Sequence, residues 1–81
     1  MKKDDFMAAV DKLKEDARVK GLSSVTITAG NVHRLVGGYP GKSHRMPHCC
    51  ETMRGMMQFG DSVVSAPPSG LGASLTIRYQ V

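Results

Sequence analysis

Residues 73–81 read ASLTIRYQV, a stretch in which apolar and polar side chains alternate. A period of two is typical of a β-strand with one buried face. The buried face would consist of Ala73, Leu75, Ile77, Tyr79 and Val81. A strand with one buried face needs neighbouring strands and a layer that covers that face.

Two further strands are expected upstream of this one. Residues 62–66 form the nearer strand, and the sequence PPSGLG at 67–72 separates it from the last one. Proline and glycine are typical of a loop between strands, so the C-terminal segment is predicted to be a hairpin. The β-branched sequence SVTIT at 24–28 indicates a third short strand, with Val25 and Ile27 facing inward.

Two helices are predicted in the first half of the chain. Over residues 4–20 apolar side chains recur at helical spacing, and Gly21 is a natural stop. The hydroxyl of Thr28 can cap a second helix over residues 29–36. We expect the buried side of this second helix to consist of Val32, Leu35 and Val36.

A third helix is predicted over residues 46–58, with Pro47 in the first turn, where proline is tolerated. Its apolar face would contain Met46, Cys49, Cys50, Met53, Met56 and Met57. The opposite face would expose His48, Glu51, Thr52, Arg54 and Gln58. Two cysteines adjacent in sequence are poorly placed to bridge distant parts of the chain, so we expect reduced, buried thiols.

Length and charge restrict the class of protein. The 81 residues, with 41% hydrophobic and 22% charged side chains, predict one folded domain spanning residues 1–81. The formal net charge is +4, and residues 31–58 contain four Lys or Arg, three His and a single acid. Such a segment is typical of a face that binds a polyanion, although a solvated basic surface gives the same pattern.

The expected elements follow the order helix, strand, helix, helix, strand, loop, strand. This order resembles the winged helix-turn-helix family over about residues 4–81. The resemblance implies an α+β fold with a small three-stranded antiparallel sheet, in which the loop of the terminal hairpin is the wing. It also implies that residues 46–58 are a recognition helix that enters the major groove of duplex DNA.

The resemblance identifies candidate DNA contacts at the start and on the exposed face of the third helix. Base edges would be read by Arg45, His48, Glu51 and Thr52. Phosphates would be held by Arg34, Lys42, His44 and Arg54, and by backbone N–H groups at Ser69 and Gly70. This chain has no Lys or Arg between Gly55 and Ile77, which departs from the cationic wing of many family members.

A second, partial resemblance involves the sequence VGGYPGKSHRMP at 36–47, together with Asp61 and the sequence APPSG at 66–70. These segments are similar to small uncharacterised bacterial and phage domains, some of which are joined to HNH-type nucleases. The similarity implies a DNA-reading module from a phage or another mobile element. The sequence itself has no HNH metal site.

The three His and two Cys within residues 33–50 also suggest zinc, but their spacing does not fit a zinc site. Adjacent residues on a helix point about 100° apart, so Cys49 and Cys50 cannot easily bind one ion together. A reactive Cys–His pair is disfavoured because both thiols lie on the apolar stripe. The glycines at 37, 38 and 41 lack the spacing of a phosphate-binding loop. We therefore expect no catalytic residue, no metal and no cofactor.

The N-terminus has no apolar signal-peptide region and the chain has no long apolar run, so we expect a soluble cytoplasmic protein without membrane contact. The expected function is DNA binding of the transcription-regulator type, without enzymatic activity.

The alternative function is a protein-interaction module, such as a small phage or mobile-element inhibitor or adaptor on the same scaffold. The sequence also allows a homodimer, in which the first helix or the edge of the final strand would form the contact.

Overall fold

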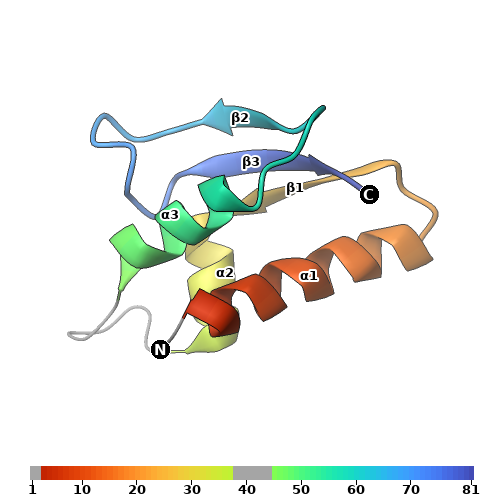
Figure 1. Ribbon diagram of the computed structural model, residues 1–81, viewed down its shortest axis with the longest axis horizontal. Helices are drawn as coiled ribbons and strands as arrows, with labels where there is room; N and C mark the ends of the chain where they lie inside the picture. Colours follow the sequence, from red (N-terminus) through yellow and green to blue (C-terminus); the bar gives the residue numbers. More distant parts are fainter. Residues whose placement is uncertain (1–2, 38–44) are drawn as a thin grey trace.

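The computed structural model describes residues 3–37 and 45–81, and these ranges contain three helices and three strands (Figure 1). The elements in chain order are α1 (Lys3–Val19), β1 (Ser24–Thr28), α2 (Ala29–Val36), α3 (Met46–Gly55), β2 (Ser62–Ser65) and β3 (Thr76–Gln80). The expected α+β class and order of elements are confirmed.

The strands form one antiparallel sheet in the order β1-β3-β2. Val25 lies opposite Tyr79 and Ile27 opposite Ile77, so the inward-facing residues of β1 and β3 meet on the same face of the sheet. Both edges of β3 are hydrogen-bonded to neighbouring strands. The expectation that the final strand could offer its edge to a second copy is therefore wrong.

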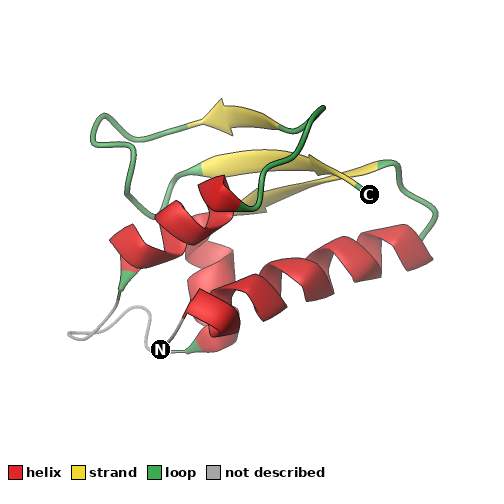
Figure 2. Ribbon diagram, viewed as in Figure 1, coloured by secondary structure: helices red, strands yellow, loops and turns green. Residues whose placement is uncertain are grey.

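The three helices pack against one face of the sheet (Figure 2). Ile27, Ile77 and Tyr79 point toward the helices and are buried, and Val25 beside them is half-buried. On the other face, Thr26, Arg78 and Gln80 are exposed. The largest fully buried side chains of the core are Phe6, Val10, Val32, His33, Cys49, Cys50, Met53, Leu75, Ile77 and Tyr79. The sheet is thus covered on one side, as expected for a chain that alternates apolar and polar residues along its strands.

The first two helices begin and end at the residues that the sequence indicates. Thr28 accepts a hydrogen bond on its side-chain oxygen from the backbone N–H of Asn31, at 3.2 Å, and so caps α2. After α1, Gly21 adopts a φ of +81°, a backbone conformation that favours glycine. These local signals explain why the predicted limits agree closely with the structure.

The buried face of α2 differs from the prediction. Leu35 is 53% exposed, whereas His33 is fully buried together with Val32. The buried residues Ala29, Val32 and His33 follow the i, i+3, i+4 pattern of a helix face, and a histidine occupies a position that an apolar side chain would usually fill. The choice of Leu35 as a core residue is therefore wrong.

The third helix is shorter than predicted, because it ends at Gly55 rather than at residue 58. The Asp61 side chain accepts hydrogen bonds from the backbone N–H groups of Gln58, at 2.8 Å, and Gln80, at 2.7 Å. This carboxylate ties the segment after α3 to the end of β3. Met56 and Met57 are half-buried in this connection.

The last strand also begins later than predicted, at Thr76 instead of residue 73. The carbonyl oxygens of Ala73 and Leu75 accept hydrogen bonds from the backbone N–H groups of Gly30 and Ala29, at 3.0 and 2.8 Å. The first N–H groups of a helix lack partners within the helix. Residues before β3 therefore provide the acceptors that the start of α2 needs.

In the described part of the chain, no helix combines the length and apolar character needed to cross a membrane.

Candidate nucleic-acid interface

The third helix begins against a buried histidine of α2. The backbone N–H of Arg45 donates a hydrogen bond of 2.8 Å to Nε2 of His33. His33 is fully buried, so this acceptor lies inside the fold. Arg45 precedes the helix without making a side-chain capping bond, and a proline lies in the first turn. His33 therefore fixes the position at which α3 starts.

The aromatic ring of Phe6 joins α1 to both α2 and α3. It meets the imidazole of His33 at a centroid distance of 5.2 Å and that of His48 at 5.5 Å, both in edge-to-face geometry. Edge-to-face pairs of this kind add to the energy of burial. His48 is consequently half-buried against α1, and only part of its ring is open to a ligand.

Thr52 lies on the inner side of α3. It is 3% exposed, and its hydroxyl donates a hydrogen bond of 2.9 Å to the backbone oxygen of His48. A hydroxyl that is buried and bonded to its own helix cannot reach a base edge. The prediction that Thr52 belongs to the exposed, base-reading face is wrong.

The outer side of α3 exposes Glu51 and Arg54, and Arg45 is exposed at its start. Beside this helix, the start of α1 closes a shallow pocket of about 150 Å³ that is lined by Lys3, His48, Glu51, Thr52 and Gly55. The exposed face of α3 is therefore narrow, with one acid between two arginines.

Arg54 connects α3 to the loop between β2 and β3. Its Nη2 donates a hydrogen bond of 3.1 Å to the carbonyl oxygen of Gly70. Gly70 has a φ of +77° in this loop, and an added Cβ would lie 3.4 Å from the same Arg54 nitrogen. Helix and loop thus form one continuous surface, and Arg54 retains further N–H donors for a ligand.

In the loop between β2 and β3, polar groups of the predicted phosphate contacts Ser69 and Gly70 are hydrogen-bonded within the loop. The backbone N–H of Gly70 donates to the carbonyl oxygen of Pro67 at 2.8 Å, and the Ser69 hydroxyl accepts from the backbone N–H of Leu71 at 3.3 Å. The prediction that the Gly70 N–H group binds phosphate is wrong, because that donor closes the turn.

The other predicted phosphate contacts are not gathered at this surface. Arg34 lies exposed on α2, where its Nη1 donates to Oδ1 of Asn31 at 3.3 Å. Lys42 and His44 lie outside the described residues. Of the predicted set, the structure exposes Glu51 and Arg54 on α3 and Arg45 just before it. His48 is half-buried on the same helix, and Ser69 is exposed on the loop that Arg54 contacts through Gly70.

The two cysteines are buried and unbridged, as expected. The thiol of Cys49 donates to the carbonyl oxygen of Ala29 at 3.6 Å, and that of Cys50 to the carbonyl oxygen of Gly72 at 3.3 Å. Burial raises the pKa of Cys49 to about 12 and raises the pKa of Cys50. A raised pKa keeps a thiol protonated at neutral pH, which opposes a role as nucleophile or metal ligand.

Two structural residues at this surface escaped the sequence analysis. His33 was grouped with the basic segment, although its spacing from Ala29 and Val32 could have placed it on the buried face. Asp61 entered the sequence analysis only as part of the second resemblance, and no local pattern indicates that its carboxylate accepts a bond from Gln80.

Across residues 3–37 and 45–81, no three His, Cys, Asp or Glu side chains come together as a metal site would require. Comparison of the chain with protein-family models, with curated proteins and with solved structures found no match.

Proposed function

We propose that this chain is a winged helix-turn-helix domain that binds duplex DNA and serves as a regulator of the transcription-factor type. In this proposal α2 and α3 are the helix-turn-helix, α3 enters the major groove, and the loop between β2 and β3 is the wing. The order of elements and the antiparallel sheet support this assignment, since the wing hairpin packs beside a recognition helix in this family.

The observation that carries the proposal is the bond from Arg54 to Gly70, because it fixes the hairpin loop beside α3. Arg45 at the other end of the helix is held by its backbone to a fully buried histidine. Two exposed guanidinium groups are thus carried on one helix whose position is fixed at both ends. Pre-positioned arginines are suited to phosphate oxygens and guanine edges.

The proposed roles follow from the geometry of each side chain. Arg45 and Glu51 read base edges, with the exposed part of the His48 ring beside them. Arg54 and Ser69 contact the phosphate backbone next to the loop. Arg34, Lys42 and His44 remain proposed phosphate contacts farther from α3.

The test is binding of the purified protein to a labelled random-sequence duplex, measured by fluorescence anisotropy over a range of salt concentrations. We expect affinity to fall steeply with salt, because phosphate contacts release counterions. The double variant Arg45→Ala, Arg54→Ala should bind at least tenfold more weakly, since each contact to DNA is worth roughly 1–3 kcal/mol.

The matched control is the double variant Arg18→Ala, Arg78→Ala, which removes the same charge from the end of α1 and from the uncovered face of the sheet. It should retain most of the wild-type affinity. Equal losses in both double variants would reduce the binding to a non-specific effect of net charge and would overturn the proposed interface.

The alternative function is a protein-interaction module on the same scaffold. The fully exposed ring of Phe59 and the exposed side chain of Val64 favour it, because large apolar groups in water often mark protein contacts. Glu51 in the middle of the exposed α3 face also weakens attraction to a polyanion. Absence of DNA binding even at low salt would exclude the first proposal and leave this one.

A further inference from the structure

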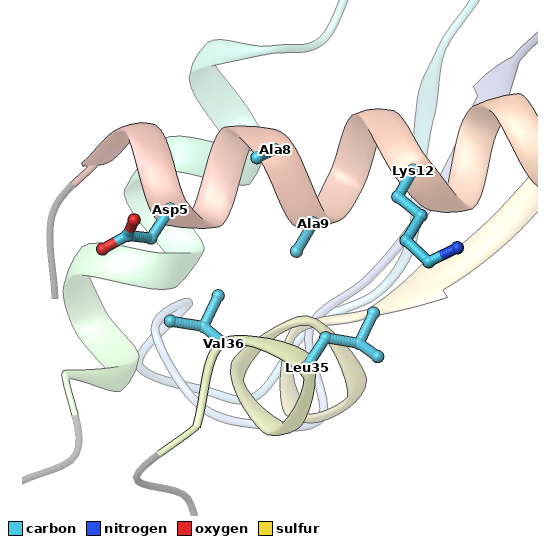
Figure 3. Close-up of a pocket in the computed structure, with 6 residues that line it drawn as sticks. All are labelled: Asp5, Ala8, Ala9, Lys12, Leu35 and Val36. Carbon is cyan, nitrogen blue, oxygen red and sulfur yellow. The ribbon is translucent and has the colours of Figure 1, made fainter.

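A groove of about 550 Å³ lies between α1 and α2, and none of the residues that line it is a proposed DNA contact. It is lined by Asp5, Ala8, Ala9, Lys12, Leu35 and Val36. Figure 3 shows Leu35 and Val36 projecting from α2 toward α1, with Asp5 and Lys12 at opposite ends of the groove. The middle is apolar and the two ends carry opposite charges.

Two features of this groove fit an approaching helix. Ala8 and Ala9 are small, and small side chains permit helix axes to come close together. Leu35 projects beside them and is 53% exposed, although it is a large apolar side chain. An exposed leucine next to a shallow alanine surface gains by burial against a matching apolar surface.

The charges identify which surface matches. Asp5 precedes Ala8 by three residues, and Lys12 follows Ala9 by three residues. The pattern along α1 is therefore symmetric about the Ala8–Ala9 pair, with opposite signs at its ends. A second copy of α1 running antiparallel brings its Lys12 to Asp5 and its Asp5 to Lys12. A two-fold axis requires this kind of self-complementary surface.

We propose that the groove between α1 and α2 binds a second copy of this chain and forms a two-fold symmetric dimer. Ala8 and Ala9 lie at the axis, Leu35 of each copy packs against the groove of the other, and two Asp5–Lys12 pairs flank the contact. The DNA interface is not part of this contact, so the proposal does not depend on the proposed function.

In a single chain Lys12 is paired within α1, with Nζ 3.4 Å from Oδ2 of Asp16. Both side chains of this pair are largely exposed, and exposed pairs contribute little to stability. For Lys12, dimer formation therefore replaces a weak pair in water with a pair beside an apolar contact.

The test is a charge exchange followed by sedimentation equilibrium from micromolar to millimolar concentration. We expect the wild type to reach twice the monomer mass of 8.7 kDa. Asp5→Lys alone and Lys12→Glu alone each create two like-charged pairs in the dimer, so each should raise the dissociation constant about tenfold or more. An equimolar mixture of the two variants should recover the affinity, because both pairs are then opposite in sign.

The matched control is the mixture of Asp4→Lys and Lys20→Glu, which makes the same charge changes in the first turn of α1 and just after its end. Asp4 shares the first turn with Asp5, and Lys20 follows Asp16 by four residues as Lys12 precedes it by four. Neither control residue lines the groove. The control variants should dimerise like the wild type, both alone and mixed.

Leu35→Ala should also weaken the dimer, and circular dichroism should show that every variant is folded. A wild type that stays monomeric up to millimolar concentration would overturn the proposal. A dimer that ignores the charge exchange, or that responds equally to the control pair, would place the contact elsewhere and would overturn it too.

Discussion

The surroundings of α3 and the groove between α1 and α2 are built in different ways. Around α3, directional hydrogen bonds tie side chains to backbone groups of distant segments: His33 to Arg45, Tyr79 to Met53 and Arg54 to Gly70. The groove instead presents small and branched apolar side chains with a charge at each end. The first arrangement fixes an orientation, whereas the second leaves a surface free to be covered.

This difference predicts how the two regions respond to change. Substitutions around α3 should reduce the stability of the fold, because buried polar groups left without partners are costly. Substitutions in the groove should leave the fold intact and alter only association.

The largest effect is expected for the reactivity of the α3 cysteines. Burial raises the pKa of Cys49 to about 12, so at pH 8 the thiolate fraction in the folded protein is far smaller than in the unfolded chain. Alkylation by iodoacetamide at pH 8 should therefore be at least about a hundredfold slower in the native protein than in urea. Mass spectrometry of quenched samples measures both rates.

The sign of the pH dependence follows from the same shift. A raised pKa in the folded state contributes stability that is fully present below the ordinary value of 9.0 and is lost as pH rises toward about 12. Unfolding should therefore become easier across that alkaline interval. Native alkylation as fast as that of the unfolded chain would contradict the buried position of these thiols.

The second effect concerns His33. The substitution His33→Ala removes a fully buried ring, its contact with Phe6 and the acceptor for the Arg45 N–H group. Loss of a large buried side chain together with a hydrogen bond should lower the free energy of unfolding by about 3 kcal/mol. Urea denaturation followed by circular dichroism measures this change. A loss below about 0.5 kcal/mol, typical of a surface site, would show that His33 does not fix the start of α3.

The third effect concerns Asp61, which accepts hydrogen bonds from the backbone N–H groups of Gln58 and Gln80. Asp61→Ala should lower the free energy of unfolding by about 2 kcal/mol, because bonds to a charged acceptor are stronger than neutral ones. Asp61→Asn keeps the shape and one carbonyl acceptor, so it should lose about half as much. Equal stability of both variants and the wild type would mean that the connection after α3 does not depend on this carboxylate.

The sequence predicts well where local signals act and poorly where distant contacts decide. The Thr28 cap, the Gly21 stop and the alternation of residues 76–80 are local, and the structure confirms the elements that they mark. The shorter α3 and the later start of β3 depend on bonds to Asp61 and to the first residues of α2, which are far apart in sequence.

In the candidate site, too, local patterns predict exposure on one helix but not contacts between helices. Helical spacing places Arg54 on the outer side of α3, the sequence places Arg45 at its start, and both are exposed. The burial of Thr52 and the exposure of Leu35 depend on how α1 lies across the other helices, which a single-helix pattern does not encode. The groove between α1 and α2 likewise combines residues from two helices, so the pattern of Asp5 and Lys12 along α1 does not reveal it alone.

The smallest effect on folding is expected for Leu35, on the groove side of the comparison. Because about half of this side chain is in water, Leu35→Ala should change the free energy of unfolding by less than about 0.5 kcal/mol. The denaturation must be measured at low micromolar concentration, since dimerisation would stabilise the wild type and make the difference depend on concentration. His33→Ala, on the opposite face of the same short helix, is the internal comparison. If Leu35→Ala proved as damaging as His33→Ala in the monomer, the groove would belong to the core rather than to a contact surface, and the contrast between the two regions would fail.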